Sequence, residues 1–171
     1  MRVLVACVGN IFCSDDGFGV TVARELLERG GLPEGVEVVD TGIRGMHLAY
    51  QLLDGYDALI LIDTVHRDGP PGTIYRLEHD LDAPAVDAVT PGPDAHGMDP
   101  GTVLALLAEL AAANGLAQPV RRVLIVGCEP AELSEGMGLS EPVAAAVELA
   151  VRTVDDLLAL LSETTPEGTR S

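Results

Sequence analysis

The chain has 171 residues, of which 47% are hydrophobic and only 3% aromatic, so it is long enough for one domain with an aliphatic core. Its 10 basic and 27 acidic residues give a formal net charge of −17. That charge repels phosphate backbones and anionic membranes, and the scarcity of aromatic residues argues against base stacking. The composition therefore predicts neither a nucleic-acid partner nor membrane binding, and no apolar run approaches the ~20 residues of a membrane span.

The first half of the chain alternates apolar runs with amphipathic ones. In chain order we expect a buried strand at Arg2–Val8, a helix at Gly17–Glu28, a strand at Val36–Val39, a short helix at Met46–Leu53 and an apolar strand at Ala58–Ile62. Ser14 and Asp15 are both good N-cap residues for the first helix. Gly9 is expected to supply a backbone conformation or a close approach that a side chain would forbid.

The second half continues the same alternation after a Gly/Pro turn. It predicts an edge strand at Thr73–Leu77, a long loop at Asp80–Met98, a helix at Pro100–Ala113, a strand at Arg122–Val126 and a long helix at Glu141–Leu161 with Ser140 as its N-cap. Strands alternating with helices indicate a mostly parallel α/β sheet covered on both faces. We expect one domain at residues 1–162 and a flexible tail at 163–171.

The three cysteines, Cys7, Cys13 and Cys128, are widely spaced, and none of them is in a CxxC pair. This usage fits a reducing cytoplasm better than a disulfide scaffold. The short apolar run at the N-terminus is also predicted to be a strand and not a signal peptide. We therefore expect a cytoplasmic protein.

Three side chains are candidates for a common site. Asp16 lies in the loop after the first strand, Asp63 follows the apolar run Ala58–Ile62, and His96 lies in a Gly/Pro-rich loop. Because the carboxyl ends of parallel strands share one edge of a sheet, side chains there converge on one crevice. Two carboxylates and one imidazole would suit a divalent transition metal with an open coordination position.

Each candidate also has a purely structural explanation. An aspartate in the first loop can cap the following helix, which accounts most naturally for Asp15 and leaves Asp16 to face the crevice. Asp63 can cap the amide of Thr64 or Val65. His96 can be an ordinary surface-loop histidine.

A competing hypothesis is a cysteine hydrolase. Cys13 lies near the start of a helix, where the pKa of a thiol is lowered, and it could form a nucleophilic triad with His96 and Asp63. The neighbouring Asp15 and Asp16 oppose this, because they raise the cost of a thiolate.

Taken in order, several motifs resemble the hydrogenase maturation endopeptidases, which trim the carboxyl end of the large subunit of nickel–iron hydrogenases. The motifs are Val8-Gly9-Asn10, Asp15-Asp16-Gly17-Phe18-Gly19-Val20, Asp40-Thr41-Gly42, Gly45-Met46, Leu61-Ile62-Asp63, Pro71-Gly72-Thr73, the loop around His96, Gly127-Cys128-Glu129-Pro130 and Gly136-Met137-Gly138-Leu139-Ser140. Their order and spacing over nearly the whole chain carry the resemblance.

The resemblance implies a three-layer α/β/α sandwich with a twisted, mostly parallel sheet of about five strands. It also implies that Asp16, Asp63 and His96 form the metal site and carry catalysis. Some members have Glu where this chain has Asp16, so the first loop must lie slightly closer to the ion. Arg44, after the second strand, is a candidate for holding the terminal carboxylate of the substrate.

In the family, the partner is a large-subunit precursor already loaded with nickel, and the protease removes a short carboxyl-terminal peptide. The resemblance thus implies nickel supplied by the substrate and no separate cofactor, and zinc or cadmium can take the same ligands in a crystal. Water activation could use the metal or a carboxylate. A non-catalytic, metal-sensing chaperone is the remaining alternative, and we favour a monomer.

Overall fold

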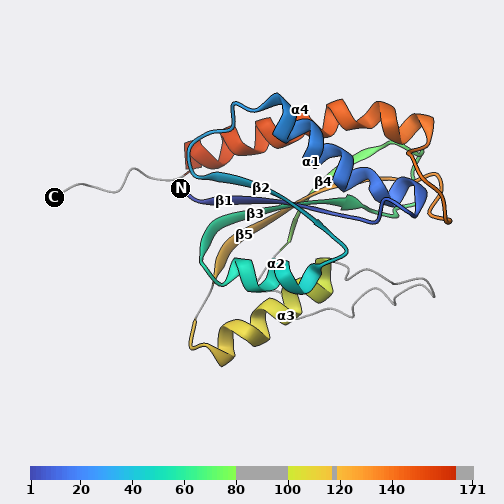
Figure 1. Ribbon diagram of the computed structural model, residues 1–171. Helices are drawn as coiled ribbons and strands as arrows, with labels where there is room; N and C mark the ends of the chain where they lie inside the picture. The colour runs from blue at the N-terminus through green and yellow to red at the C-terminus, as the bar shows by residue number, and fades with distance from the viewer. Residues whose placement is uncertain (80–99, 117–118, 165–171) are drawn as a thin grey trace.

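The computed structural model describes residues 1–79, 100–116 and 119–164 (Figure 1). Within them, the strands β2-β1-β3-β5-β4 form one sheet in that spatial order, and β4 alone runs antiparallel to its neighbour. The strands are β1 (Val3–Val8), β2 (Val36–Gly42), β3 (Tyr56–Thr64), β4 (Ile74–His79) and β5 (Val120–Cys128). The helices are a 3-10 turn, η1 (Ser14–Gly17), and α1 (Phe18–Arg29), α2 (Gly45–Leu52), α3 (Pro100–Ala113) and α4 (Glu141–Thr164).

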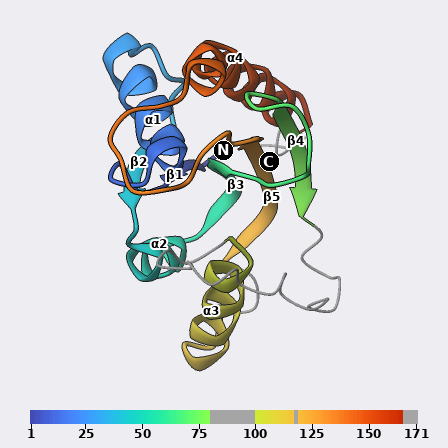
Figure 2. The same cartoon turned by 90° about the vertical axis from the view of Figure 1, so that its right-hand side faces the viewer.

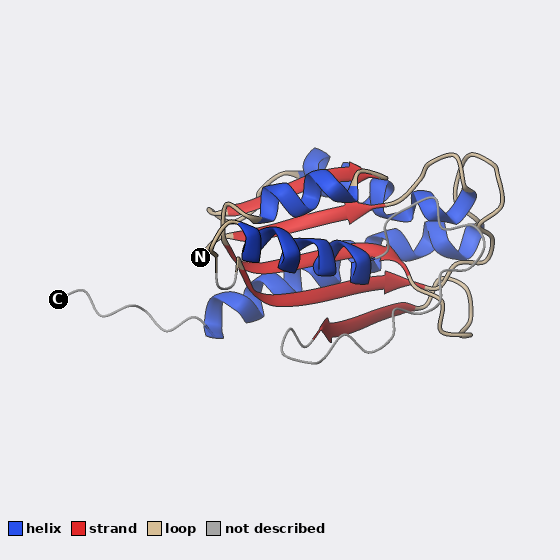
Figure 3. Cartoon of the chain, turned by 90° about the horizontal axis from the view of Figure 1, so that it is seen from below, coloured by secondary structure: helices blue, strands red, loops and turns tan. Residues whose placement is uncertain are grey.

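The sheet is the middle layer of three. Helices α1 and α4 cover one face, and α2 and α3 cover the other (Figure 1). Seen from below, the arrow of β4 points opposite to those of the other strands (Figure 3). The predicted α/β/α sandwich with a mostly parallel, five-stranded sheet is confirmed. Among the described helices, none is both long and apolar enough to cross a bilayer.

The central strands are buried on both faces. Every residue of β1 is buried, as expected for a parallel strand with helices above and below. In β3, Ile60 and Ile62 pack under α1 and α4, whereas Leu59 and Leu61 pack towards α2 and α3. Because successive side chains alternate, the next residue, Asp63, belongs to the face covered by α2 and α3.

Several elements extend beyond their predicted ends. The apolar run of β3 stops at Ile62, but the strand continues, with Asp63 paired to Gly127 and Thr64 to Cys128. The sequence misses this extension because a backbone ladder needs no apolar side chain. Helix α4 likewise continues past Leu161 to Thr164. The predicted loop at residues 80–98 lies wholly outside the described residues. The predicted tail at residues 163–171 lies outside them from residue 165 onwards.

The predicted capping of the first helix is wrong. The N-cap of α1 is Gly17, with no side-chain hydrogen bond, and the turn η1 precedes the helix. The Ser14 hydroxyl donates instead to the Ser134 carbonyl at 2.9 Å, and the Asp15 carboxylate binds other segments, described below. The sequence pattern identified two hydrogen-bonding side chains, but their partners are distant in the sequence and are not the helix that was expected.

Two glycines allow close backbone approaches around the start of α1. A Cβ at Gly9, where φ is +149°, would lie 2.0 Å from the Asp16 carbonyl oxygen, which confirms the expected role of this glycine. A Cβ at Gly19 would lie 2.1 Å from the Val8 carbonyl oxygen and 2.8 Å from that of Ile62. All three contacts are with backbone oxygens, so none can be relieved by a side-chain rotation.

The Gly19→Ala substitution is expected to lower the free energy of unfolding by about 3 kcal/mol, because α1 must move away from the ends of β1 and β3. Gly31→Ala is the control. Gly31 has a φ of +71°, but a Cβ added there would have nothing within 4 Å, so only about 1 kcal/mol of backbone strain is expected. Urea unfolding of both variants measures the difference. Equal losses would contradict the close-packing explanation.

Candidate active site at the carboxyl edge of the sheet

The ends of β1, β3 and β5 meet at one edge of the sheet, which faces the viewer in Figure 2. The turn η1 follows β1 there, and the segment after β5 pairs with the loop before η1 through a bridge between Cys13 and Gly136. Two of the three predicted site residues lie on this edge.

Thr64 joins the two candidate carboxylates. Its amide donates to Asp63 Oδ1 at 2.7 Å, and its hydroxyl donates to Asp16 Oδ1 at 3.3 Å. Asp63 is only 8% exposed, and Asp16 is half-buried. The bond to the Thr64 amide is the one expected from the capping explanation of Asp63, yet that same residue also brings Asp16 to Asp63 from a distant part of the chain.

The loop after β1 fixes the other side of Asp16. The Asn10 amide donates to Asp16 Oδ2 at 2.9 Å and lies 3.1 Å from the Asp16 carbonyl oxygen. The Asn10 side chain turns the other way, accepting from the Phe12 amide and donating to Cys13 Sγ. Since a carboxylate oxygen can accept more than one bond, Asp16 can accept further bonds besides those from Asn10 and Thr64.

His96 lies outside the described residues, so its distance from Asp16 and Asp63 stays a prediction. Helix α3 starts at Pro100, four residues after His96, and its first residues lie nearer the carboxyl ends of the strands than its last residues do (Figure 1). It also packs on the face of the sheet to which Asp63 belongs. In the described part of the chain, no three His, Cys, Asp or Glu side chains are arranged to hold a metal ion, so a third ligand would have to come from elsewhere.

Asp15 is a structural residue that organises this edge. It is fully buried, and its carboxylate accepts from the amides of Ala131, Glu132 and Ser140 at 2.8, 2.9 and 2.6 Å and from the Ser140 hydroxyl at 2.9 Å. Burial alone would raise the pKa of Asp15, but these hydrogen bonds lower it below its usual value. Asp15 therefore anchors the segment after β5 and the start of α4 beside η1.

The thiols differ in their surroundings. Burial raises the pKa of Cys7 far above its usual value and, with the charges of Asp15 and Glu129, that of Cys128 to about 12. Neither is a thiolate at neutral pH. Cys13 is half-buried and accepts from Asn10 Nδ2 at 3.4 Å, and no described histidine hydrogen-bonds to it. Nothing in the described residues favours the cysteine-hydrolase alternative.

Arg44 follows β2 and is exposed. Its amide donates to the Thr41 carbonyl at 2.8 Å, and it forms the N-cap of α2. Because Arg44 is exposed and follows the end of β2, its side chain is accessible beside the carboxyl edge. Its contact with the terminal carboxylate of a substrate stays a prediction.

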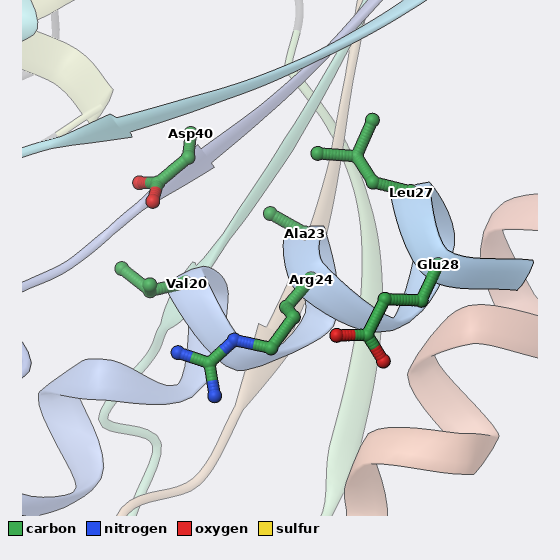
Figure 4. A pocket seen from close by; sticks show the side chains of 6 residues that line it. All are labelled: Val20, Ala23, Arg24, Leu27, Glu28 and Asp40. Carbon is green, nitrogen blue, oxygen red and sulfur yellow. The ribbon is translucent and has the colours of Figure 1, made fainter.

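A hollow of about 250 Å³ opens elsewhere, between α1 and the end of β2 (Figure 4). The residues that line it are Val20, Ala23, Arg24, Leu27, Glu28 and Asp40. Acidic and basic side chains are both among them, but Asp16 and Asp63 are not. The candidate site does not coincide with this hollow.

Sequence reasoning missed two residues that shape the edge. The sequence points to Asn10 only as part of the motif Val8-Gly9-Asn10, although a polar residue directly after the Gly that follows a buried strand is a usable signal. The sequence likewise points to Glu129 only as part of a motif, although this residue directly follows β5 and is 1% exposed in the structure. Its partners come from the loop after β3 and from β4, so no local pattern could have identified them.

Residues 20–156 match the family described as hydrogenase maturation protease. The chain is 33% identical over 169 residues to the hydrogenase 2 maturation protease of Escherichia coli strain K12, covering 98% of this chain and 95% of that protein. It is 36% identical over 163 residues to the hydrogenase expression/formation protein HupM of Azotobacter chroococcum, covering 95% and 72%. The solved structure of the hydrogenase maturating endopeptidase HybD from Escherichia coli superposes with a TM-score of 0.74 at 29% identity, covering 96% and 94%.

The family match spans most of the chain, and the curated relatives align over nearly all of it. The solved structure carries the same α/β architecture. The chain therefore belongs to the hydrogenase maturation protease family and is a peptidase, a hydrolase of peptide bonds.

Proposed function

We propose that this protease removes the carboxyl-terminal extension of a nickel–iron hydrogenase large-subunit precursor, and that it recognises the nickel already bound to that precursor. The observation that carries the proposal is the linkage of Asp16 and Asp63 through Thr64 at the carboxyl edge. Carboxylates that a shared neighbour holds at one edge of the sheet are suitable ligands for a cation.

The chemistry of the donor set fits a nickel ion that already has ligands in the precursor. Carboxylate oxygens and a neutral imidazole nitrogen are suitable ligands for divalent transition metals, and an incomplete set of protein ligands leaves room for substrate atoms. We assign the imidazole to His96. Bound nickel would supply charge that polarises a neighbouring peptide carbonyl.

The backbone around the site supports a rigid arrangement. The Thr64 amide fixes Asp63, and the Asn10 amide fixes Asp16, so both carboxylates are oriented before a substrate arrives. Preorganised ligands avoid the cost of reorganisation on binding. This arrangement would let the protease discriminate a nickel-loaded precursor from an empty one.

The experiment is to incubate the purified protein with its precursor in nickel-loaded and nickel-free form and to weigh the products by mass spectrometry. We expect a single carboxyl-terminal peptide to be released from the nickel-loaded precursor only. Equal cleavage of both forms would contradict nickel recognition. Binding without release of a peptide would instead favour the metal-sensing chaperone.

A further inference from the structure

A buried carboxylate lies beyond β5, outside the pair formed by Asp16 and Asp63. The side chain of Glu129 is 2% exposed. Its Oε2 accepts from the Tyr75 hydroxyl and from the Arg67 amide, both at 2.8 Å. A carboxylate withdrawn from water needs such partners, and these come from β4 and from the loop after β3.

Glu129 stays charged at neutral pH. Burial alone would raise its pKa, but the Tyr75 hydroxyl, the amides of Arg67 and Gly69 and the nearby His66 together lower it below its usual value. The charge therefore persists in a place with little water to screen it.

The remaining oxygen of Glu129 binds a histidine. His66 Nδ1 lies 2.9 Å from Glu129 Oε1, while the His66 side chain is 68% exposed. The carboxylate can only accept, so Nδ1 carries a proton, and in the neutral ring Nε2 holds the lone pair. Because the ring is largely exposed and Glu129 is its hydrogen-bond partner among the described residues, Nε2 is accessible to a molecule from outside.

His66 lies close to the candidate site along the chain. It is two residues after Thr64, a span of at most about 7 Å between Cα atoms. His66 does not complete a metal site with Asp16 and Asp63, since no such group of three exists in the described ranges. An exposed imidazole oriented by a buried carboxylate has the arrangement of a proton-transfer group.

We propose that His66, oriented by Glu129, is a further catalytic residue of this protease and transfers the proton during peptide hydrolysis. This inference rests on the proposed function. As water attacks the scissile carbonyl carbon, its proton passes to His66 Nε2, and the C–O bond forms. As the C–N bond breaks, the same proton passes from Nε2 to the leaving nitrogen. The products are a new carboxyl terminus and an amine, and His66 returns to its neutral state.

The first part of the test needs no activity. Long-range ¹H–¹⁵N NMR of the free protein, at a pH where the ring is neutral, reports which nitrogen carries the proton. We expect Nδ1–H in the wild type. In Glu129→Gln, the side-chain oxygen is expected to accept from the Tyr75 hydroxyl and the Arg67 amide, so the NH₂ group faces His66. Nδ1 must then accept a hydrogen bond from this NH₂ group, and the tautomer changes to Nε2–H. An Nε2–H tautomer in the wild type overturns the inference.

The second part measures cleavage of the nickel-loaded precursor. His66→Gln keeps a polar side chain of similar length but cannot take up a proton, so kcat is expected to fall by about 100-fold or more while KM stays within about threefold. His79→Gln, on the exposed edge strand β4, is the matched control and is expected to cleave as the wild type does. Thermal unfolding checks that both variants are folded.

The outcomes separate the two levels of the proposal. Unchanged kcat in His66→Gln, beside an active wild type, overturns the role of His66 and leaves nickel-dependent cleavage intact. No cleavage by the wild type overturns the proposed function itself, whatever the tautomer of His66.

Discussion

Asp63→Asn is expected to lower the rate of cleavage of the nickel-loaded precursor by about 100-fold or more. The asparagine keeps the size of the side chain, and its oxygen can still accept from the Thr64 amide, so the end of β3 is preserved. What is lost is the charge, and one oxygen becomes an NH₂ group that cannot bind a cation. Changing only an outer-shell partner of a metal site already costs roughly 10–100-fold, so loss of a ligand should cost at least as much.

Asp54→Asn is the matched control for this substitution. Asp54 is exposed in the turn after α2, and its hydrogen bonds to described residues are made by its backbone: its amide donates to the Gln51 carbonyl, and its carbonyl accepts from Arg2. The control should cleave at the wild-type rate. Asp63→Asn with normal activity and normal folding would remove Asp63 from the site.

Asp15→Ala is expected to have the largest effect on stability, about 3–5 kcal/mol of the free energy of unfolding. The carboxylate is the acceptor for donors of Ala131, Glu132 and Ser140, and all of these lose their partner at once. Asp15→Asn should lose less, because one oxygen remains, although its NH₂ group then faces a donor. Chemical denaturation measures both, and a loss below about 1 kcal/mol in Asp15→Ala would contradict the anchoring role.

The same carboxylate predicts a dependence on pH. The pKa of Asp15 is lower in the folded protein than in the unfolded chain, so the unfolded state takes up a proton first as the pH falls. The stabilisation is complete above about pH 4 and is lost as the pH drops through the unfolded value towards the folded one. The stability of Asp15→Asn should depend less on pH in this window than that of the wild type.

The order of elements could be predicted because burial dictates composition. Strands β1 and β3 are covered on both faces, so their sequences are continuous apolar runs, and helix α3 has the predicted bounds. The ends of the strands could not be predicted, because polar residues such as Asp63 and Thr64 extend β3 through backbone pairing alone.

The site was predictable only to the level of single residues. The rule that side chains converge at the carboxyl edge identified Asp16 and Asp63. It could not identify Thr64 as the residue that joins them, nor Glu129 as the partner of His66, because these contacts depend on how distant loops pack. The polar neighbours Arg67 and Asp68 indicate a solvated His66, and its ring is indeed exposed, but one nitrogen is held by a buried charge.

The central claim is that Asp16, Asp63 and His96 bind one cation together, and titration of the purified protein with nickel, zinc or cadmium tests it most directly. The account predicts one ion per chain for the wild type and for His79→Gln, and loss of that ion in each of Asp16→Asn, Asp63→Asn and His96→Gln. Undiminished binding of the ion in any one of these three variants, with the fold intact, would contradict it.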